Sequence, residues 1–166
     1  MHIEHQRKLR AQLRDTLNPI ASESGFYISG IEFTSDSRGP LVRIYIDGSN
    51  GIGIDNCASL SKEFSLILDV EDPITTAYTL EVSSPGLDRL LELPQDFDRF
   101  QDFHIRIKRV NQKSKLDGVL LSHTTEGIQV RTAIDERLIP FTNIVMIRLH
   151  PTDEEIQRLI SPGDPT

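Results

Sequence analysis

The first hydrophobic pattern of the chain has the period of an α-helix. Leu9, Leu13 and Leu17 recur every four residues between polar positions, which is typical of a helix with one apolar face. Pro19 is expected to kink this helix or to mark its last turns. Gly25 stands where a left-handed residue commonly ends a helix. The pattern predicts an opening helix that ends near residue 25.

Strand and helix patterns then alternate up to residue 82. Residues 26–34 and 41–46 alternate apolar and polar side chains around an Asp-Ser-Arg-Gly-Pro turn, which predicts a β-hairpin. Residues 77–82 predict a third strand. Before it, Asp55 is expected to cap a helix with an apolar face made of Cys57, Leu60, Phe64, Ile67 and Leu68. The predicted order is αββαβ, a KH-like α+β layer with two helices on one side of a small sheet.

The second half of the chain predicts short strands in close succession. One helical turn at 96–100 precedes strand patterns at residues 103–110, 118–122, 127–132, 137–140 and 145–149. Five such strands predict a small all-β barrel of the SH3-like or Sm-like class, closed so that no edge is exposed. Residues 141–143 predict a 3₁₀ turn, and Thr152 or Asp153 should cap a last helix that reaches Ile160.

These patterns divide the chain into two domains and a tail. We expect an N-terminal α+β domain at residues 1–88 and a C-terminal SH3-like barrel at residues 89–152. Residues 153–166 are expected to form the short helix and a disordered end.

The composition favours a cytoplasmic globular protein. Charged residues make up 26% of the chain, and no apolar run approaches the roughly 20 residues that cross a bilayer. The N-terminus lacks the apolar stretch of a signal peptide, and the single Cys57 fits a reducing compartment. We therefore expect no membrane partner.

The charge is acidic and unevenly distributed. The net charge is −7, which argues against a protein that coats duplex nucleic acid. Residues 1–92 carry 8 Lys and Arg against 14 Asp and Glu, whereas residues 93–166 carry 10 against 11. The acidic first half suits a basic protein partner.

A basic run in the second half is the strongest electrostatic feature. Between Phe103 and Leu116 there is no acidic residue, and the five cations are Arg106, Lys108, Arg109, Lys113 and Lys115. The run is either a solvated rim or an rRNA-facing patch. Five phosphate contacts would give a salt slope of at most about −3 to −4 on single-stranded RNA. Such a patch assists binding without being able to recruit the protein alone.

Residues for catalysis or metal binding are not grouped in the sequence. The five histidines have no ligand-spaced partner, and Cys57 lies on an apolar helix face, which favours packing over a nucleophilic role. Gly48 to Gly51 matches the GxxG clamp of KH domains, but acidic residues flank it. We expect no enzyme, cofactor or metal. A hydrolase or transferase would require His123 or Cys57 in a polar cleft beside carboxylates.

The stretch YTLEVSSPGLDR, residues 78–89, closely resembles the signature of the bacterial ribosome maturation factor family RimP. The segments NPIASESGFYISGIEF, VRIYIDGSNGIGIDNCASLSKEFSLILDVEDPI, GVLLSHTTEGIQV and IPFTNIVMIRL agree with the family in order. The resemblance implies an αββαβ domain followed by an SH3-like barrel. It also implies binding to the free small (30S) ribosomal subunit during maturation, with one protein contact to ribosomal protein twelve of that subunit, and without cofactor or catalysis. We expect rRNA as a further partner. Leu90 departs from the family, which usually has proline there, and residues 111–116 lack its usual glycine and basic pattern.

The resemblance transfers a candidate interdomain and ribosome-contacting site, made of Ser83, Ser84, Pro85, Gly86, Leu87, Asp88 and Arg89. Pro85 and Gly86 suit positions two and three of a type II turn, where the glycine would have a positive φ. The segment either shapes the connection between the domains, with Leu87 packed there, or contacts the ribosome directly. Both roles are compatible, because a fixed connection lets two modest surfaces bind together.

Two functions remain open on the sequence. The first is a monomeric assembly factor required for maturation of the 30S subunit, which acts by binding the immature particle. The second is a general RNA-binding regulator with KH-like and Sm-like modules. The acidic net charge and the few aromatic residues weigh against the second.

Overall fold

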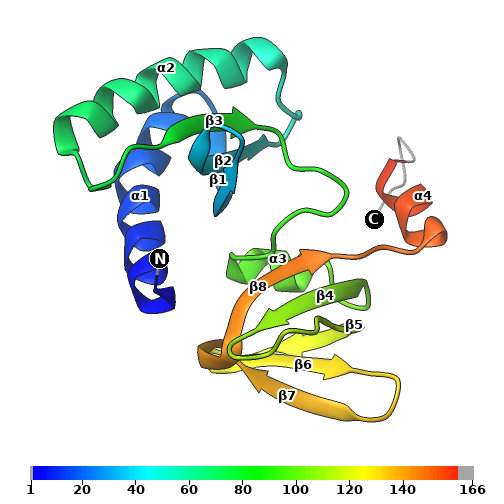
Figure 1. Cartoon of the computed structure of the whole chain (residues 1–166). Helices are drawn as coiled ribbons and strands as arrows, with labels where there is room; N and C mark the ends of the chain where they lie inside the picture. The colour runs from blue at the N-terminus through cyan, green and yellow to red at the C-terminus, as the bar shows by residue number, and fades with distance from the viewer. Residues whose placement is uncertain (1, 161–166) are drawn as a thin grey trace. The chain divides into compact units, whose positions relative to one another are not determined.

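The computed structural model describes residues 2–160 and divides the chain into two compact units, residues 1–85 and 86–166 (Figure 1). The division falls inside the Ser83–Arg89 segment. The expected disordered tail, residues 161–166, lies outside the described residues. No helix in residues 2–160 is both long enough and apolar enough to cross a membrane.

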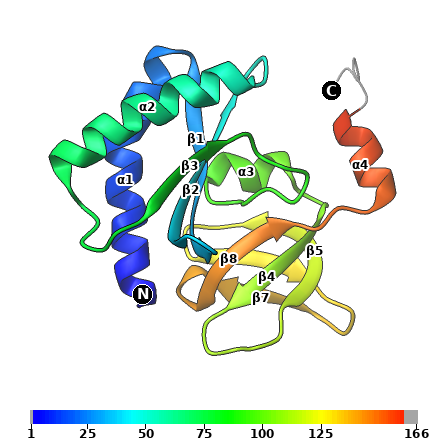
Figure 2. The same ribbon diagram turned by 45° about the horizontal axis from the view of Figure 1, so that its top comes forward.

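The N-terminal unit has the predicted αββαβ order. Its elements are α1 (Ile3–Glu23), β1 (Phe26–Asp36), β2 (Gly39–Gly48), α2 (Ile54–Glu71) and β3 (Thr79–Ser83). The sheet order is β1-β2-β3; β1 pairs antiparallel with β2, and β3 pairs parallel with β2 after the α2 crossover. Both helices cover the same face of this sheet (Figures 1 and 2).

The core of this unit joins the two helix faces that the sequence predicts. The buried side chains of α1 and α2 pack on the inward side chains of β1 and β2; they are Leu9, Leu13, Leu17, Ala21, Leu60, Phe64, Leu68, Ile28, Ile31, Val42, Ile44 and Ile46. Pro19 lies inside α1 one turn before its end, and Gly25 (φ +83°) follows with its N–H bonded to the carbonyl of Ser22. The predicted left-handed glycine after α1 is confirmed.

The start of α2 differs from the prediction. Gly53, and not Asp55, is the N-cap, and its N–H donates to the side-chain oxygen of Asn56 at 3.0 Å. Asp55 is the second residue of α2, in its first turn, where its negative charge interacts favourably with the positive end of the helix dipole. Glycine is itself a frequent N-cap, so both positions suited the role on the sequence alone.

The C-terminal unit contains the five predicted strands. Its elements are α3 (Pro94–Arg99), β4 (His104–Arg109), β5 (Leu116–His123), β6 (Gly127–Arg131), β7 (Glu136–Pro140), the 3₁₀ turn η1 (Phe141–Asn143), β8 (Ile144–Leu149) and α4 (Asp153–Ile160). All pairings are antiparallel, in the order β7-β6-β5-β4-β8.

The predicted closed barrel is not found. In the sheet of residues 86–160, β7 and β8 are the two ends of the order and do not pair with each other. The three residues of η1 turn the chain between these strands, so that β8 pairs with β4 whereas β7 pairs only with β6. The sheet nevertheless surrounds its own core, which includes Ile105, Ile107, Leu120, Ile128, Val130 and Ile147.

Candidate functional site

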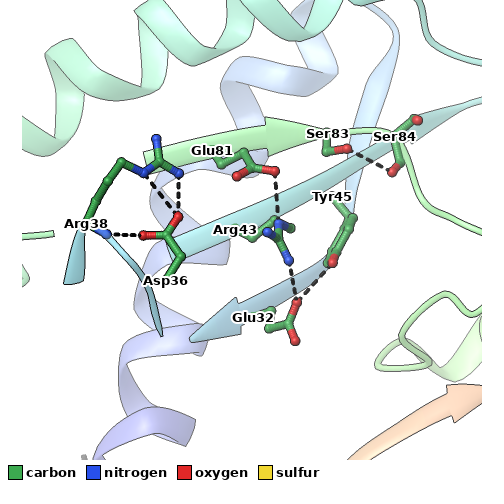
Figure 3. Close-up of polar contacts among 8 residues, drawn as sticks. All are labelled: Glu32, Asp36, Arg38, Arg43, Tyr45, Glu81, Ser83 and Ser84. Atoms are coloured by element: carbon green, nitrogen blue, oxygen red, sulfur yellow. Dashed lines mark hydrogen bonds and ion pairs between the residues drawn. The ribbon is translucent and has the colours of Figure 1, made fainter. Parts of the chain in front are cut away.

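The signature segment begins at the end of β3. Ser83 pairs with Tyr45 of β2, and its hydroxyl donates to the carbonyl of Ser84 at 3.3 Å (Figure 3). Ser84 is exposed. The sheet therefore orients Ser83, whereas Ser84 presents its side chain to solvent.

The turn in the signature is not of the predicted type. Gly86 does not have a positive φ, and the bend lies at Leu87 and Asp88. A Cβ on Gly86 would lie 2.9 Å from Oδ1 of Asp88, so that glycine leaves room for this carboxylate. Leu87 is 48% exposed rather than packed.

The end of the signature is attached to β8. The carbonyl of Arg89 accepts from the N–H of Leu149 at 3.0 Å, and Leu90 forms a bridge with Arg148. Arg148 also donates from Nη1 to the carbonyl of Asp88 at 3.2 Å. The guanidinium of Arg89 is buried 5.5 Å from the Phe100 ring centroid. Leu90, in place of the family's proline, is buried, and the next N–H, that of Leu91, donates to the carbonyl of Ile147 at 2.9 Å.

A polar network crosses the N-terminal sheet on the face opposite the helices (Figure 3). Arg43 donates from Nε to Glu81 at 3.0 Å and from Nη1 to Glu32 at 3.3 Å, and the Tyr45 hydroxyl donates to Glu32 at 2.9 Å. These side chains come from three neighbouring strands. This network was not predicted from the sequence, although the outward positions of Arg43 and Tyr45 follow from the alternation in β2.

This network changes the ionisation of its members. Burial raises the pKa of Tyr45, and the acceptor Glu32 adds to the rise, whereas Arg43 opposes it. The hydrogen bond to Glu81 raises the pKa of Arg43, which is a cation at any physiological pH. The charges are therefore neutralised mostly within the sheet, which indicates a structural role for this face.

The basic run is divided by the fold into paired and exposed cations. Arg106 donates from Nε and Nη2 to the two carboxylate oxygens of Asp117, at 2.7 and 2.9 Å, and from Nη2 to Nε2 of His150 at 3.1 Å. The hydrogen bond from Arg106 lowers the pKa of Asp117. Arg109 is half-buried, whereas Lys108, Lys113 and Lys115 are exposed. The available patch is thus smaller than the five cations suggested.

A cavity of about 520 Å³ lies within the C-terminal unit and contains His123. Phe97 of α3, His123 at the end of β5 and Phe141 of η1 are the aromatic residues of its lining, and Glu92 also lines it. Nε2 of His123 donates to Asp98 at 2.8 Å. This pairing could not be predicted from the sequence, because 25 residues separate the two side chains.

His104 is likewise paired with a carboxylate, that of Glu155 in α4. Among residues 2–160, no three His, Cys, Asp or Glu side chains form a group that could hold a metal ion. Cys57 is half-buried on α2, and burial raises the pKa of its thiol, which disfavours the reactive thiolate.

Comparison with protein families identifies the N-terminal unit. Residues 16–88 match the family model of the RimP N-terminal domain. The matched region runs from the second half of α1 through β3 and includes Ser83 to Asp88 of the signature. The chain therefore carries the N-terminal domain of RimP proteins.

Proposed function

We propose that this protein is a non-enzymatic, cytoplasmic factor for maturation of the small ribosomal subunit, which acts as a monomer by binding the immature particle. The observation that carries the proposal is the RimP N-terminal domain at residues 16–88. Binding energy would shift a local region of rRNA and protein toward its mature conformation, with no bond made or broken.

The charge of the N-terminal unit supports a basic protein as its partner. Residues 1–85 carry 7 Lys and Arg against 12 Asp and Glu, a net charge of −5. Opposite charge accelerates association and disfavours wrong partners. The partner that we propose is ribosomal protein twelve of the small subunit, as the family resemblance implies.

The exposed lysines of the C-terminal unit support a secondary contact with rRNA. Lys108 on β4, and Lys113 and Lys115 in the loop before β5, have side chains open to phosphates. Three such contacts would give a salt slope of about −2 on single-stranded RNA. We also infer that this unit is an open SH3-like fold, since five antiparallel strands with a 3₁₀ turn before the last one support that class.

Sedimentation of a cell extract tests the proposal. The protein should migrate with free small subunits and be absent from polysomes; equal occupancy of polysomes would contradict it. Lys108→Glu should weaken binding to purified small subunits and reduce the salt slope by about one. Lys62→Glu is the matched control, because Lys62 is also exposed but lies on the acidic helix α2.

The pairing of His123 with Asp98 is the one observation that favours a rival, a hydrolase. A histidine oriented by a carboxylate can serve as a general base. Within the part of the chain that the structure describes, however, the cavity lining has threonines as its only hydroxyl groups and includes no serine, cysteine or lysine. His123→Ala should affect small-subunit maturation in cells only as far as it weakens binding to the subunit. Loss of maturation with full binding to the subunit would favour the rival.

A further inference from the structure

The cavity of the C-terminal unit has the shape and surface of a side-chain receptor. The Phe97 and Phe141 rings lie 5.7 Å apart between centroids, and His123 lies 5.5 Å from Phe97. These three rings come from α3, η1 and the end of β5, all parts of one compact unit. A volume of about 520 Å³ exceeds the space that a single water molecule requires and admits a long side chain.

The charges around the cavity favour a cationic occupant. Among residues 2–160, the cavity lining includes Glu92 and no lysine or arginine, and Asp98 accepts a hydrogen bond from the His123 ring. A nucleotide would bring its phosphate toward these carboxylates. An aliphatic stem that ends in a cation satisfies both features, because the stem packs on the rings and the cation approaches Glu92.

Arginine fits this surface better than lysine. Its guanidinium is planar and weakly hydrated, and it stacks on aromatic faces. Within residues 2–160, the protein itself stacks arginine on phenylalanine: Arg99 lies 4.7 Å from the Phe100 centroid, and Arg158 lies 4.8 Å from that of Phe103. Both pairs belong to the C-terminal unit, where the same contact would be repeated with a partner's side chain.

We propose that this cavity binds one arginine side chain of a basic protein partner, with the stem against Phe97 and Phe141 and the guanidinium at Glu92. The identity of the partner rests on the proposed function, under which it is a basic protein of the small subunit. The cavity would thus be a second protein contact, in addition to that of the acidic N-terminal unit. It is distinct from the lysines of β4 and its following loop, which are proposed to contact rRNA.

Nuclear magnetic resonance titration of the full chain tests the cavity without the ribosome. Capped arginine should shift the signals of Phe97, His123 and Phe141, and capped citrulline, its neutral isostere, should bind about tenfold more weakly. Glu92→Gln should remove most of that difference. Unmoved signals, equal effects of the two probes, or a stronger response to adenosine monophosphate would overturn the proposal.

A blocked variant tests whether the ribosome uses the cavity. Thr125→Arg places a cation in the lining, and Gln101→Arg adds the same charge at an exposed position outside it. Thr125→Arg should abolish the capped-arginine shifts and weaken binding to small subunits about tenfold, whereas Gln101→Arg should do neither. Equal binding of the two variants to small subunits would overturn the proposal that the cavity takes part in subunit binding. If the unmodified protein binds no subunits, the proposed function fails. The titration then still tests whether the cavity binds an arginine side chain.

Discussion

Glu155 of α4 accepts hydrogen bonds from both the backbone and the side chain of His104, at 3.1 and 3.0 Å, across 51 residues of sequence. The same carboxylate accepts from the N–H of Thr152, whose hydroxyl accepts in return from the N–H of Glu155. One buried side chain therefore caps α4 and attaches it to β4.

The stability of this attachment should depend on pH. Burial alone would raise the pKa of Glu155, but the hydrogen bonds from His104 and Thr152 outweigh it and hold the pKa below its usual value of about 4.5. A carboxyl with a lowered folded-state pKa contributes stability above its unfolded value, and that contribution is lost as the pH falls through the folded value. The protection factors of the α4 amides, which are exchange rates corrected for the intrinsic pH dependence of exchange, should therefore be constant above about pH 5 and fall in more acidic solution.

Glu155→Gln should weaken α4 at neutral pH by about 1–3 kcal/mol, because a hydrogen bond to a charged acceptor is lost. It should also remove the acid dependence. Glu154→Gln is the control, since Glu154 is exposed in the same turn. An unchanged exchange rate in Glu155→Gln would show that Leu159 and the other apolar contacts of α4 suffice to hold it.

Elements with a regular period could be predicted from the sequence. In β4 the alternation places Ile105 and Ile107 in the core and Arg106 and Lys108 outside, as observed. The leucine period of α1 likewise predicts its buried face. These assignments succeed because they depend on local geometry and on the burial of apolar surface.

Features that depend on cross-strand register could not be predicted. Asp117 lies just beyond the basic run, and only the pairing of β4 with β5 places it opposite Arg106. Pro85-Gly86 is a local signal for a type II turn, but the attachment of Arg89 and Leu90 to β8 fixes the next residues, and the bend forms at Leu87 and Asp88 instead. The first feature depends on strand register, and in the second tertiary contacts overrode the local preference.

Two glycines should respond differently to alanine. A Cβ on Gly127 would overlap the carbonyl oxygen of Ile139 on the paired strand β7, where backbone cannot move cheaply. Gly127→Ala should cost about 1–3 kcal/mol of unfolding free energy. Gly86→Ala needs only a shift of the Asp88 side chain and should stay within about 0.5 kcal/mol. Urea unfolding followed by circular dichroism measures both free energies. A large loss of unfolding free energy in Gly86→Ala would indicate that Gly86 has the positive φ that the sequence predicts.

Removal of Asp117 should strengthen the contact with rRNA. Asp117→Asn releases the Arg106 guanidinium from its carboxylate partner and adds one cation to the exposed lysines. Affinity for small-subunit rRNA should rise, and the salt slope should become steeper by up to about one. Stability should change by no more than about 1 kcal/mol, because both side chains are more than one third exposed.

Asp135→Asn provides the control for this effect on RNA binding. Its carboxylate accepts from Thr132 and Arg137 at the β6–β7 turn, away from the basic run. Filter binding over a salt series compares the two variants with the unmodified protein. If the affinity for rRNA depended on salt concentration with the same slope in all three proteins, Arg106 would lie outside the RNA-binding surface.

The network on the N-terminal sheet should contribute to stability through Arg43. Arg43→Met leaves Glu32 and Glu81 without the cation between them and should lower the unfolding free energy by about 1–2 kcal/mol. All three tyrosines lie in residues 1–85, so tyrosine fluorescence follows the unfolding of this unit. Adding Glu32→Gln and Glu81→Gln to Arg43→Met should recover part of the loss.

The same change should appear in the ionisation of Tyr45. Burial already raises the pKa of this phenol, and Arg43 is the group that opposes the rise, so Arg43→Met should raise the pKa further. A raised folded-state pKa contributes stability below the unfolded value of about 10, and this contribution is lost as the pH rises through the folded value. Near-ultraviolet titration, with Tyr45→Phe to assign the signal, measures the shift. A lower pKa of Tyr45 in Arg43→Met would contradict this. It would mean that Glu32 no longer accepts the hydrogen bond from the Tyr45 hydroxyl once Arg43 is gone.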